Sequence, residues 1–157
     1  MVVPSREQTK NPFLSLKFDE VIMYDFQGGK GSDLSIVEDN GKLAKSVTKQ
    51  ALLDNENISK LNSKLGDPKS YGCTTAACFE PHLGFVYYLK DTIVAFVTIC
   101  LDCNRLVSSL DINAQKQGQL GQGEDAYYTL DGLSGSFREF LNQLLIKNNF
   151  SHQVKEP

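Results

Sequence analysis

Apolar and polar side chains alternate along residues 17–27, in a stretch rich in aromatic and β-branched residues. That period of two predicts a β-strand. Farther along, Asn40-Gly41 separates two partly apolar segments, and this dipeptide favours a hairpin turn because both central residues of a type I′ turn need positive φ. The polar run before the first strand, residues 1–12, predicts a disordered lead.

Two apolar runs follow, over residues 83–89 and 92–100, with Lys90-Asp91 between them. The runs predict a second hairpin with Lys90-Asp91 as its turn. Because both runs are apolar on successive positions, we expect their strands to lie in the middle of a sheet, with material packed on each face.

Helical spacing appears twice. Over residues 55–65 an apolar stripe is preceded by Asp54, a favourable N-cap, and followed by Gly66, a typical helix end. Over residues 137–149 apolar residues recur at helical intervals, and Ser136 with Glu139 has the spacing of a capping box. Between the second hairpin and this helix, residues 113–131 are rich in Gln and Gly, and we expect a flexible loop there.

These elements predict a single α+β domain over residues 13–150, followed by a tail at 151–157. The domain would contain a mainly antiparallel sheet of four to six strands, formed by two hairpins plus the N-terminal strand, with two helices packed on it. The length of 157 residues suits one domain with a substantial core.

The charge and hydropathy of the chain only exclude certain classes of protein. The formal net charge is −3, from 16 basic and 19 acidic residues that are scattered along the chain. A nucleic-acid-binding protein usually carries a basic stripe, so we expect no nucleic acid partner. No stretch of 18 apolar residues occurs, so we expect no membrane span. No hydrophobic leader is visible, which indicates a cytoplasmic protein if Met1 is the native start and an exported one if a leader was trimmed.

The candidate chemistry is a cluster of Cys78, His82, Cys100 and Cys103. If the chain folds back at Lys90-Asp91, these four side chains meet at one end of the second hairpin, although a bulge could shift the pairing by one residue. Cys73 lies in a segment of small residues and is left outside the cluster.

Three interpretations of the cluster stay open. The ligand types and spacing suit a structural zinc site formed by Cys78, His82, Cys100 and Cys103. A disulfide is the second possibility, either Cys78–Cys103 across the hairpin or Cys100–Cys103 within the CxxC pair. The third is that the cysteines are small core residues without chemistry.

The sequence CFEPH, an apolar strand, a turn and a second strand ending in ICLDC resemble an uncharacterised family of small bacterial proteins. The resemblance covers Cys78 to Cys103, and it implies that Cys78, Pro81, His82, Cys100 and Cys103 act as a unit. It brings no known activity with it. Some members of that family look exported or lipid-anchored.

For function we hold two hypotheses. The first is a non-enzymatic domain with a binding or structural role, in which the cluster stabilises the central hairpin and the partner is an unknown protein or small molecule. The second is a metal- or thiol-dependent enzyme that uses the same cluster, which requires an open coordination position or an accessible thiolate. A cleft over the cluster with Asp102 or Glu80 pointing into it would favour the enzyme.

Overall fold

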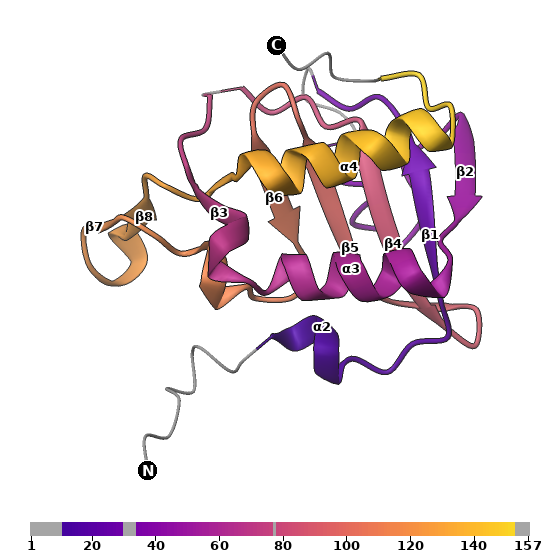
Figure 1. Ribbon diagram of the computed structural model, residues 1–157, viewed down its shortest axis with the longest axis horizontal. Helices are drawn as coiled ribbons and strands as arrows, with labels where there is room; N and C mark the ends of the chain where they lie inside the picture. The colour runs from indigo at the N-terminus through magenta and orange to yellow at the C-terminus, as the bar shows by residue number, and fades with distance from the viewer. Residues whose placement is uncertain (1–10, 30–33, 77, 153–157) are drawn as a thin grey trace.

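A five-stranded antiparallel sheet forms the centre of the protein (Figure 1). The computed structural model describes residues 11–29, 34–76 and 78–152. The strands lie in the order β2-β1-β4-β5-β6, and their bounds are Glu20–Asp25 for β1, Lys49–Leu52 for β2, Leu83–Leu89 for β4, Thr92–Cys100 for β5 and Arg105–Ser108 for β6. The predicted α+β class with a mainly antiparallel sheet is confirmed.

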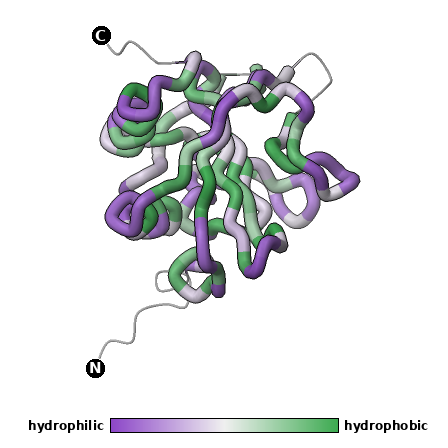
Figure 2. Tube along the Cα trace, turned by 90° about the vertical axis from the view of Figure 1, so that its right-hand side faces the viewer, coloured by the Kyte–Doolittle hydropathy of each residue, from purple (hydrophilic) through white to green (hydrophobic). Residues whose placement is uncertain are grey.

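Two helices cover one face of this sheet. They are α3, Asn55–Leu65, and α4, Gly135–Lys147, and they run side by side across the strands in Figure 1. Seen end on in Figure 2, both helices turn polar residues outward and apolar residues toward the sheet. The helices therefore bury their apolar stripes against the strands, as their spacing predicts.

The remaining elements are short. They are the helix α2 (Pro12–Ser15), the 3₁₀ turns η1 (Pro68–Ser70), η2 (Asn113–Gln115) and η3 (Gly123–Asp125), and the paired strands β3 (Tyr71–Cys73) with β9 (Gly132–Leu133) and β7 (Gln119–Leu120) with β8 (Tyr127–Tyr128). The region expected to be a flexible loop, 113–131, thus contains several of these elements. Helix α2 begins at the last residue of the predicted disordered lead, whose residues 1–10 lie outside the described part of the chain.

The second predicted hairpin, which consists of β4 and β5 and which we call the central hairpin, forms as predicted. Lys90 and Asp91 have φ values of 49° and 66°, which is the left-handed pair that a type I′ turn requires. Leu89 faces Thr92, and after a bulge Leu83 faces Ile99. The bulge shifts the pairing by one residue relative to the predicted register, and the His82 N–H donates to the Ile99 carbonyl at 3.1 Å.

The first predicted hairpin forms only its turn. Gly41 has a φ of +81°, and the flanking residues Val37 and Leu43 make an isolated bridge. Strand β2 pairs with β1 instead of with this segment. The reason is that the segment packs on the sheet face opposite the helices: a Cβ at Gly84 would lie 2.4 Å from Cγ1 of Ile36, so only glycine lets Ile36 approach.

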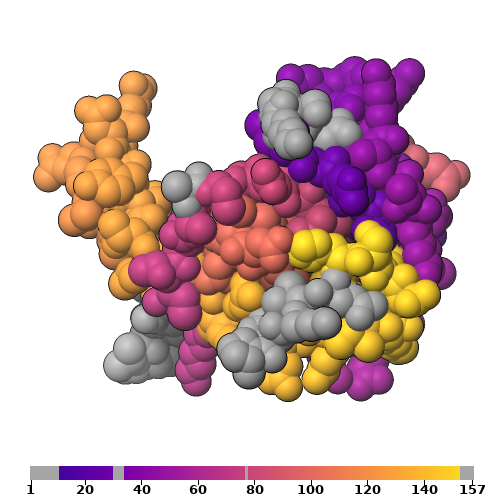
Figure 3. Space-filling model, turned by 90° about the horizontal axis from the view of Figure 1, so that it is seen from above, coloured from indigo at the N-terminus to yellow at the C-terminus, as the bar shows by residue number. Residues whose placement is uncertain are grey.

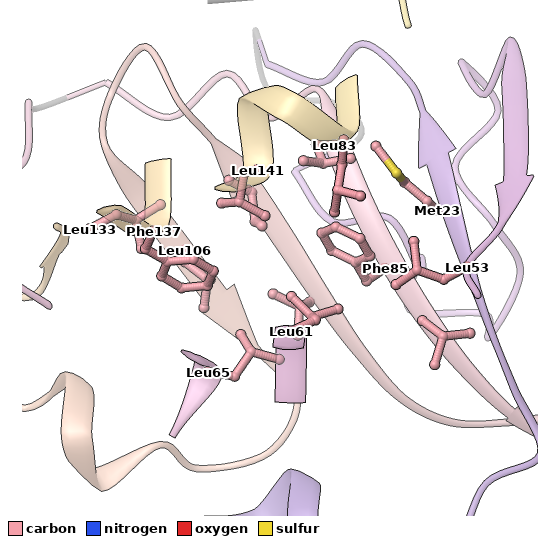
Figure 4. Packing of buried hydrophobic residues seen from close by; sticks show 14 of the residues in the cluster. Met23, Leu53, Leu61, Leu65, Leu83, Phe85, Leu106, Leu133, Phe137 and Leu141 are labelled. Carbon is pink, nitrogen blue, oxygen red and sulfur yellow. The ribbon is translucent and has the colours of Figure 1, made fainter. Parts of the chain in front are cut away.

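Buried apolar residues from the sheet, α3, α4 and the β3–β9 pair form the main core (Figure 4). Phe85 and Met23 extend from the strands, Leu61 and Leu65 from α3, and Leu141 from α4. A smaller core on the opposite face contains Tyr24, Phe26, Ile36, Val37, Ala44 and Val86. The sheet is therefore covered on both faces, with two helices on one side and an irregular segment on the other.

The N-cap predicted for α3 is confirmed, and the capping box predicted for α4 is wrong. Asp54 caps α3 as expected, because its carboxylate accepts from the Asn57 N–H at 2.8 Å. The predicted capping box at Ser136 is wrong: α4 begins at Gly135, and Oγ of Ser134 accepts from the Phe137 N–H at 3.3 Å. The N–H of Ser134 donates to the Ser70 carbonyl at 2.7 Å, which holds Ser134 outside the helix.

The C-terminal end returns to the first strand. Phe150 is buried in the main core, and Ser151 donates from its N–H and its hydroxyl to the buried carboxylate of Asp25 at 2.7 and 2.9 Å. The first residues of the predicted tail are thus fastened to the domain, whereas 153–157 lie outside the described residues. Among the described helices, none has the length and apolar character needed to cross a membrane.

Candidate functional site: a bridged cysteine and histidine cluster

The four residues singled out by the sequence lie around the connection between β5 and β6. His82 directly precedes β4, Cys100 ends β5, Cys103 lies in the turn 101–104, and Cys78 lies in the loop that precedes β4. The turn is closed by the Asn104 N–H, which donates to the Leu101 carbonyl at 3.2 Å. Folding back at Lys90-Asp91 therefore gathers these residues at one end of the hairpin.

Cys78 and Cys103 form a disulfide, with their Cα atoms 5.7 Å apart. Cys78 is exposed and Cys103 is buried, so the bridge fastens a surface loop to an internal turn. The Ala76 N–H reinforces this attachment by donating to the Cys103 carbonyl at 2.9 Å, and Nδ2 of Asn104 donates to the Thr74 carbonyl at 3.1 Å. Of the two predicted pairings, Cys78–Cys103 is the one that forms.

Cys100 and Cys73 are free thiols in very different surroundings. Cys100 is fully buried, and its Sγ accepts from the Cys103 N–H at 3.3 Å. Cys73 is exposed at the end of β3. The free sulfur of the CxxC pair thus lies against the backbone of the bridged residue.

His82 is held as a neutral ring. Its side chain is 5% exposed, and Nε2 accepts from the Leu101 N–H at 3.1 Å, so the ring hydrogen is on Nδ1. The pKa of His82 is lowered from 6.5 to about 4, mainly by burial and in addition by the nearby His152, whereas Asp102 opposes the shift. Within the described residues Nδ1 is buried and has no hydrogen-bond partner.

His152 covers His82 from the C-terminal end of the chain. The two ring centroids are 3.8 Å apart, and Nε2 of His152 lies 3.1 Å from Oδ2 of Asp102. The sequence prediction placed His152 in an exposed tail and missed this contact. No local pattern around His152 signals it, because the contact depends on where α4 ends relative to the sheet.

Arg138 of α4 is a second residue that the sequence analysis missed. Its Nη1 donates to the Leu101 carbonyl and, at 3.0 Å, to Oδ1 of Asn104. The turn 101–104 is therefore held by a helix on one side and by the disulfide on the other. Asp102 pairs with His152, and Glu80 is exposed.

In the bridged state these residues do not fit a zinc ion. A sulfur in a disulfide offers no thiolate, and Nε2 of His82 already accepts a backbone hydrogen bond. No group of three or more His, Cys, Asp or Glu side chains suited to a metal ion occurs in ranges 11–29, 34–76 and 78–152. The zinc site of Cys78, His82, Cys100 and Cys103 stays a prediction that concerns the reduced chain.

A groove of about 240 Å³ opens beside β6, directly after the bridged turn. Its walls are Arg105 to Ser108 on one side and residues of the 110–131 region on the other, namely Leu110, Asp111, Ile112, Gln115, Lys116, Tyr128 and Asp131. Residues 117–131, which we call the arm, project from the body of the protein (Figures 1 and 3). The sequence analysis identified this region only as a loop.

Comparison with models of protein families, with curated proteins and with solved structures found no match. The resemblance to a family of small bacterial proteins therefore stays a prediction.

Proposed function

We propose that this protein is a small non-enzymatic binding domain that takes a peptide segment of a partner protein in the groove beside β6. The cluster of Cys78, His82, Cys100 and Cys103 serves this function indirectly. It fixes the turn 101–104, and the strand that follows this turn forms one wall of the groove.

The distribution of exposed apolar side chains carries the proposal. Eight large hydrophobic residues are exposed in the described part of the chain, and four of them belong to β6 or to the arm: Val107, Leu120, Tyr127 and Leu130. Val107 lines the groove, and the other three lie on the arm, which contributes Tyr128 and Asp131 to the groove wall. Exposed apolar side chains gathered in one region are typical of a surface that contacts another protein.

The groove itself combines apolar and charged groups. Leu110 and Ile112 offer apolar contacts, whereas Arg105 and Asp131 can bind polar groups of a peptide. Peptide-binding sites commonly have this mixture, because pockets select side chains and polar groups set their orientation.

The state of the cluster agrees with a structural role. Two of its sulfurs are bridged to each other, the third accepts a backbone hydrogen bond, and the imidazole accepts another. Each of these contacts is made within the chain and holds the turn 101–104 or the loop before β4.

Selection from a phage-displayed library of random dodecapeptides tests the proposal. We expect enriched peptides whose binding, measured by fluorescence anisotropy, weakens at least tenfold in Val107→Asp, which puts a charge into the groove wall, and in Leu130→Asp, which puts a charge on the arm next to the wall residue Asp131. Val107 is 51% exposed and Leu130 is 38% exposed, so both substitutions should leave the fold intact.

The matched control is Leu14→Asp, which alters an exposed leucine of α2 that is 68% accessible. Peptide affinity in this variant should stay within twofold of the parent. Failure to enrich any peptide, or equal losses in the control and the groove variants, would contradict the proposal.

A further inference from the structure

We propose that Cys78, Cys100 and Cys103 form a thiol–disulfide exchange site, in which Cys100 can replace Cys78 as the partner of Cys103. The bridge then exists in two isomers. In one the free thiol is buried at Cys100, and in the other it is exposed at Cys78. This inference is independent of the peptide groove.

The placement of the three sulfurs supports the exchange. Cys103 N donates to Sγ of Cys100 at 3.3 Å, so the free sulfur already lies beside the residue whose sulfur it would attack. The adjoining turn 101–104 is closed by the Asn104 N–H, which donates to the Leu101 carbonyl. The attacking and attacked sulfurs therefore belong to residues three apart at one connection between strands, and their exchange involves this local segment.

The loop that carries Cys78 can release its sulfur and stay in place. The Ala76 N–H donates to the Cys103 carbonyl, and Asn104 donates to the Thr74 carbonyl, so two hydrogen bonds hold the loop without the disulfide. Because Cys78 is exposed and Cys100 is fully buried, the exchange moves a reactive thiol from the interior to the surface.

The step balances without an oxidant or a reductant. Because Cys100 is fully buried, the turn 101–104 must first open locally and admit water. Cys100 then loses its proton to hydroxide, and its thiolate attacks Sγ of Cys103. The Cys100–Cys103 bond forms while the Cys78–Cys103 bond breaks, and Cys78 leaves as a thiolate that takes a proton from water. One disulfide and one thiol are present before and after. The exposed Cys78 thiol is the group that a small thiol-reactive molecule or disulfide would modify.

Differential alkylation of the Cys73→Ser variant tests this proposal. Cys73 is exposed and free, so its replacement removes a competing thiol without disturbing the core. The oxidised protein is treated with light N-ethylmaleimide in the native state and then with excess heavy reagent in denaturant. Cleavage after Lys69, Lys90 and Arg105 separates Cys78 from the CxxC pair, and mass spectrometry without reduction locates the labels.

We expect light label on Cys78 together with a peptide that contains the Cys100–Cys103 bridge. Labelling should be several-fold faster at pH 8.5 than at pH 6.5, because the attacking species is a thiolate. Heavy label on Cys100 with Cys78–Cys103 intact after hours at pH 8.5 would overturn the proposal.

The control is the double variant Cys73→Ser/Cys100→Ser, which retains the bridge and lacks the attacking thiol. It should show no light label on Cys78. Labelling of Cys78 in this variant would mean that the bridge opens by another route, and the assigned role of Cys100 would be wrong.

Discussion

His82 uses its two ring nitrogens unequally. Nε2 accepts from the Leu101 N–H, whereas Nδ1 is buried without a hydrogen-bond partner in the described chain. A protonated ring donates from both nitrogens and needs an acceptor at each, whereas Nε2 faces the Leu101 N–H, which is itself a donor. The position therefore favours the neutral ring.

This preference predicts a loss of stability in acid. The pKa of His82 is about 4 in the folded protein against 6.5 for an unperturbed side chain. As the pH falls from 6.5 toward 4, the unfolded chain takes up a proton that the folded protein does not. The free energy of unfolding should therefore fall by roughly 3 kcal/mol over this window from this group alone.

Urea unfolding at pH 7.5 and pH 4.5 measures the effect. In His82→Gln, whose side-chain oxygen can still accept from the Leu101 N–H, the decrease between the two pH values should be smaller by about 2 kcal/mol than in the parent. His152→Gln should also make the decrease smaller, but by less than His82→Gln, because His152 is the lesser of the two causes that lower the pKa of His82. Equal pH dependence in the parent and in His82→Gln would contradict the assignment.

The start of α4 shows how an element is set by residues far from it in sequence. Ser134 accepts from the Phe137 N–H, while its own N–H donates to the Ser70 carbonyl beside β3. The second contact connects the cap to the β3–β9 pair. Ser136, two residues later, is exposed and lies in the first turn of the helix.

Ser134→Ala should lower the free energy of unfolding by about 1 kcal/mol, because the Phe137 N–H then loses its acceptor. Ser136→Ala should change it by less than about 0.5 kcal/mol, as expected for an exposed position without a cap. Thermal or urea unfolding of the two variants decides between the caps, and a larger loss in Ser136→Ala would restore the capping box that the sequence suggested.

Sequence patterns correctly predicted the elements that depend on residues close together in the chain. The Lys90-Asp91 turn, the Asp54 cap and the apolar strands are examples, and each formed as expected. The failures have long-range causes. The segment that follows β1 packs over Gly84 and covers that face of the sheet. No local sequence pattern indicates this contact.

The candidate site was also predicted only in part. The hairpin register brought Cys78, His82, Cys100 and Cys103 together, and the disulfide was among the predicted alternatives. The contacts from Arg138 and from His152 were not predicted. Both residues reach the cluster from α4 or from the segment after it, and their positions follow from how the helix packs on the sheet.

At the scale of the whole molecule, the Cys78–Cys103 bridge closes a loop that contains the entire central hairpin. The two cysteines are 25 residues apart, and a cross-link of this span restricts the unfolded chain. In the chain-entropy description such a loop contributes about 3 kcal/mol to stability. The loop includes β4, the central strand of the sheet, and β5 beside it.

We therefore expect Cys78→Ser to lower the free energy of unfolding by about 3 kcal/mol and to leave the far-ultraviolet circular dichroism unchanged. Cys73→Ser, which alters an exposed free thiol, should have little effect. Urea unfolding under non-reducing conditions makes the comparison, and matching midpoints for the two variants would show that the bridge does not stabilise the fold.

The fastening of Ser151 to Asp25 has a consequence for biosynthesis. Strand β1 leaves the ribosome before the other strands of the sheet, yet its buried carboxylate finds its partner only in Ser151. Helix α4 and Phe150, which complete the main core, also arrive late. Until synthesis has passed residue 151, only α3 can cover the helix-bearing face of the sheet, and the remaining apolar surface of that face stays exposed in the nascent chain.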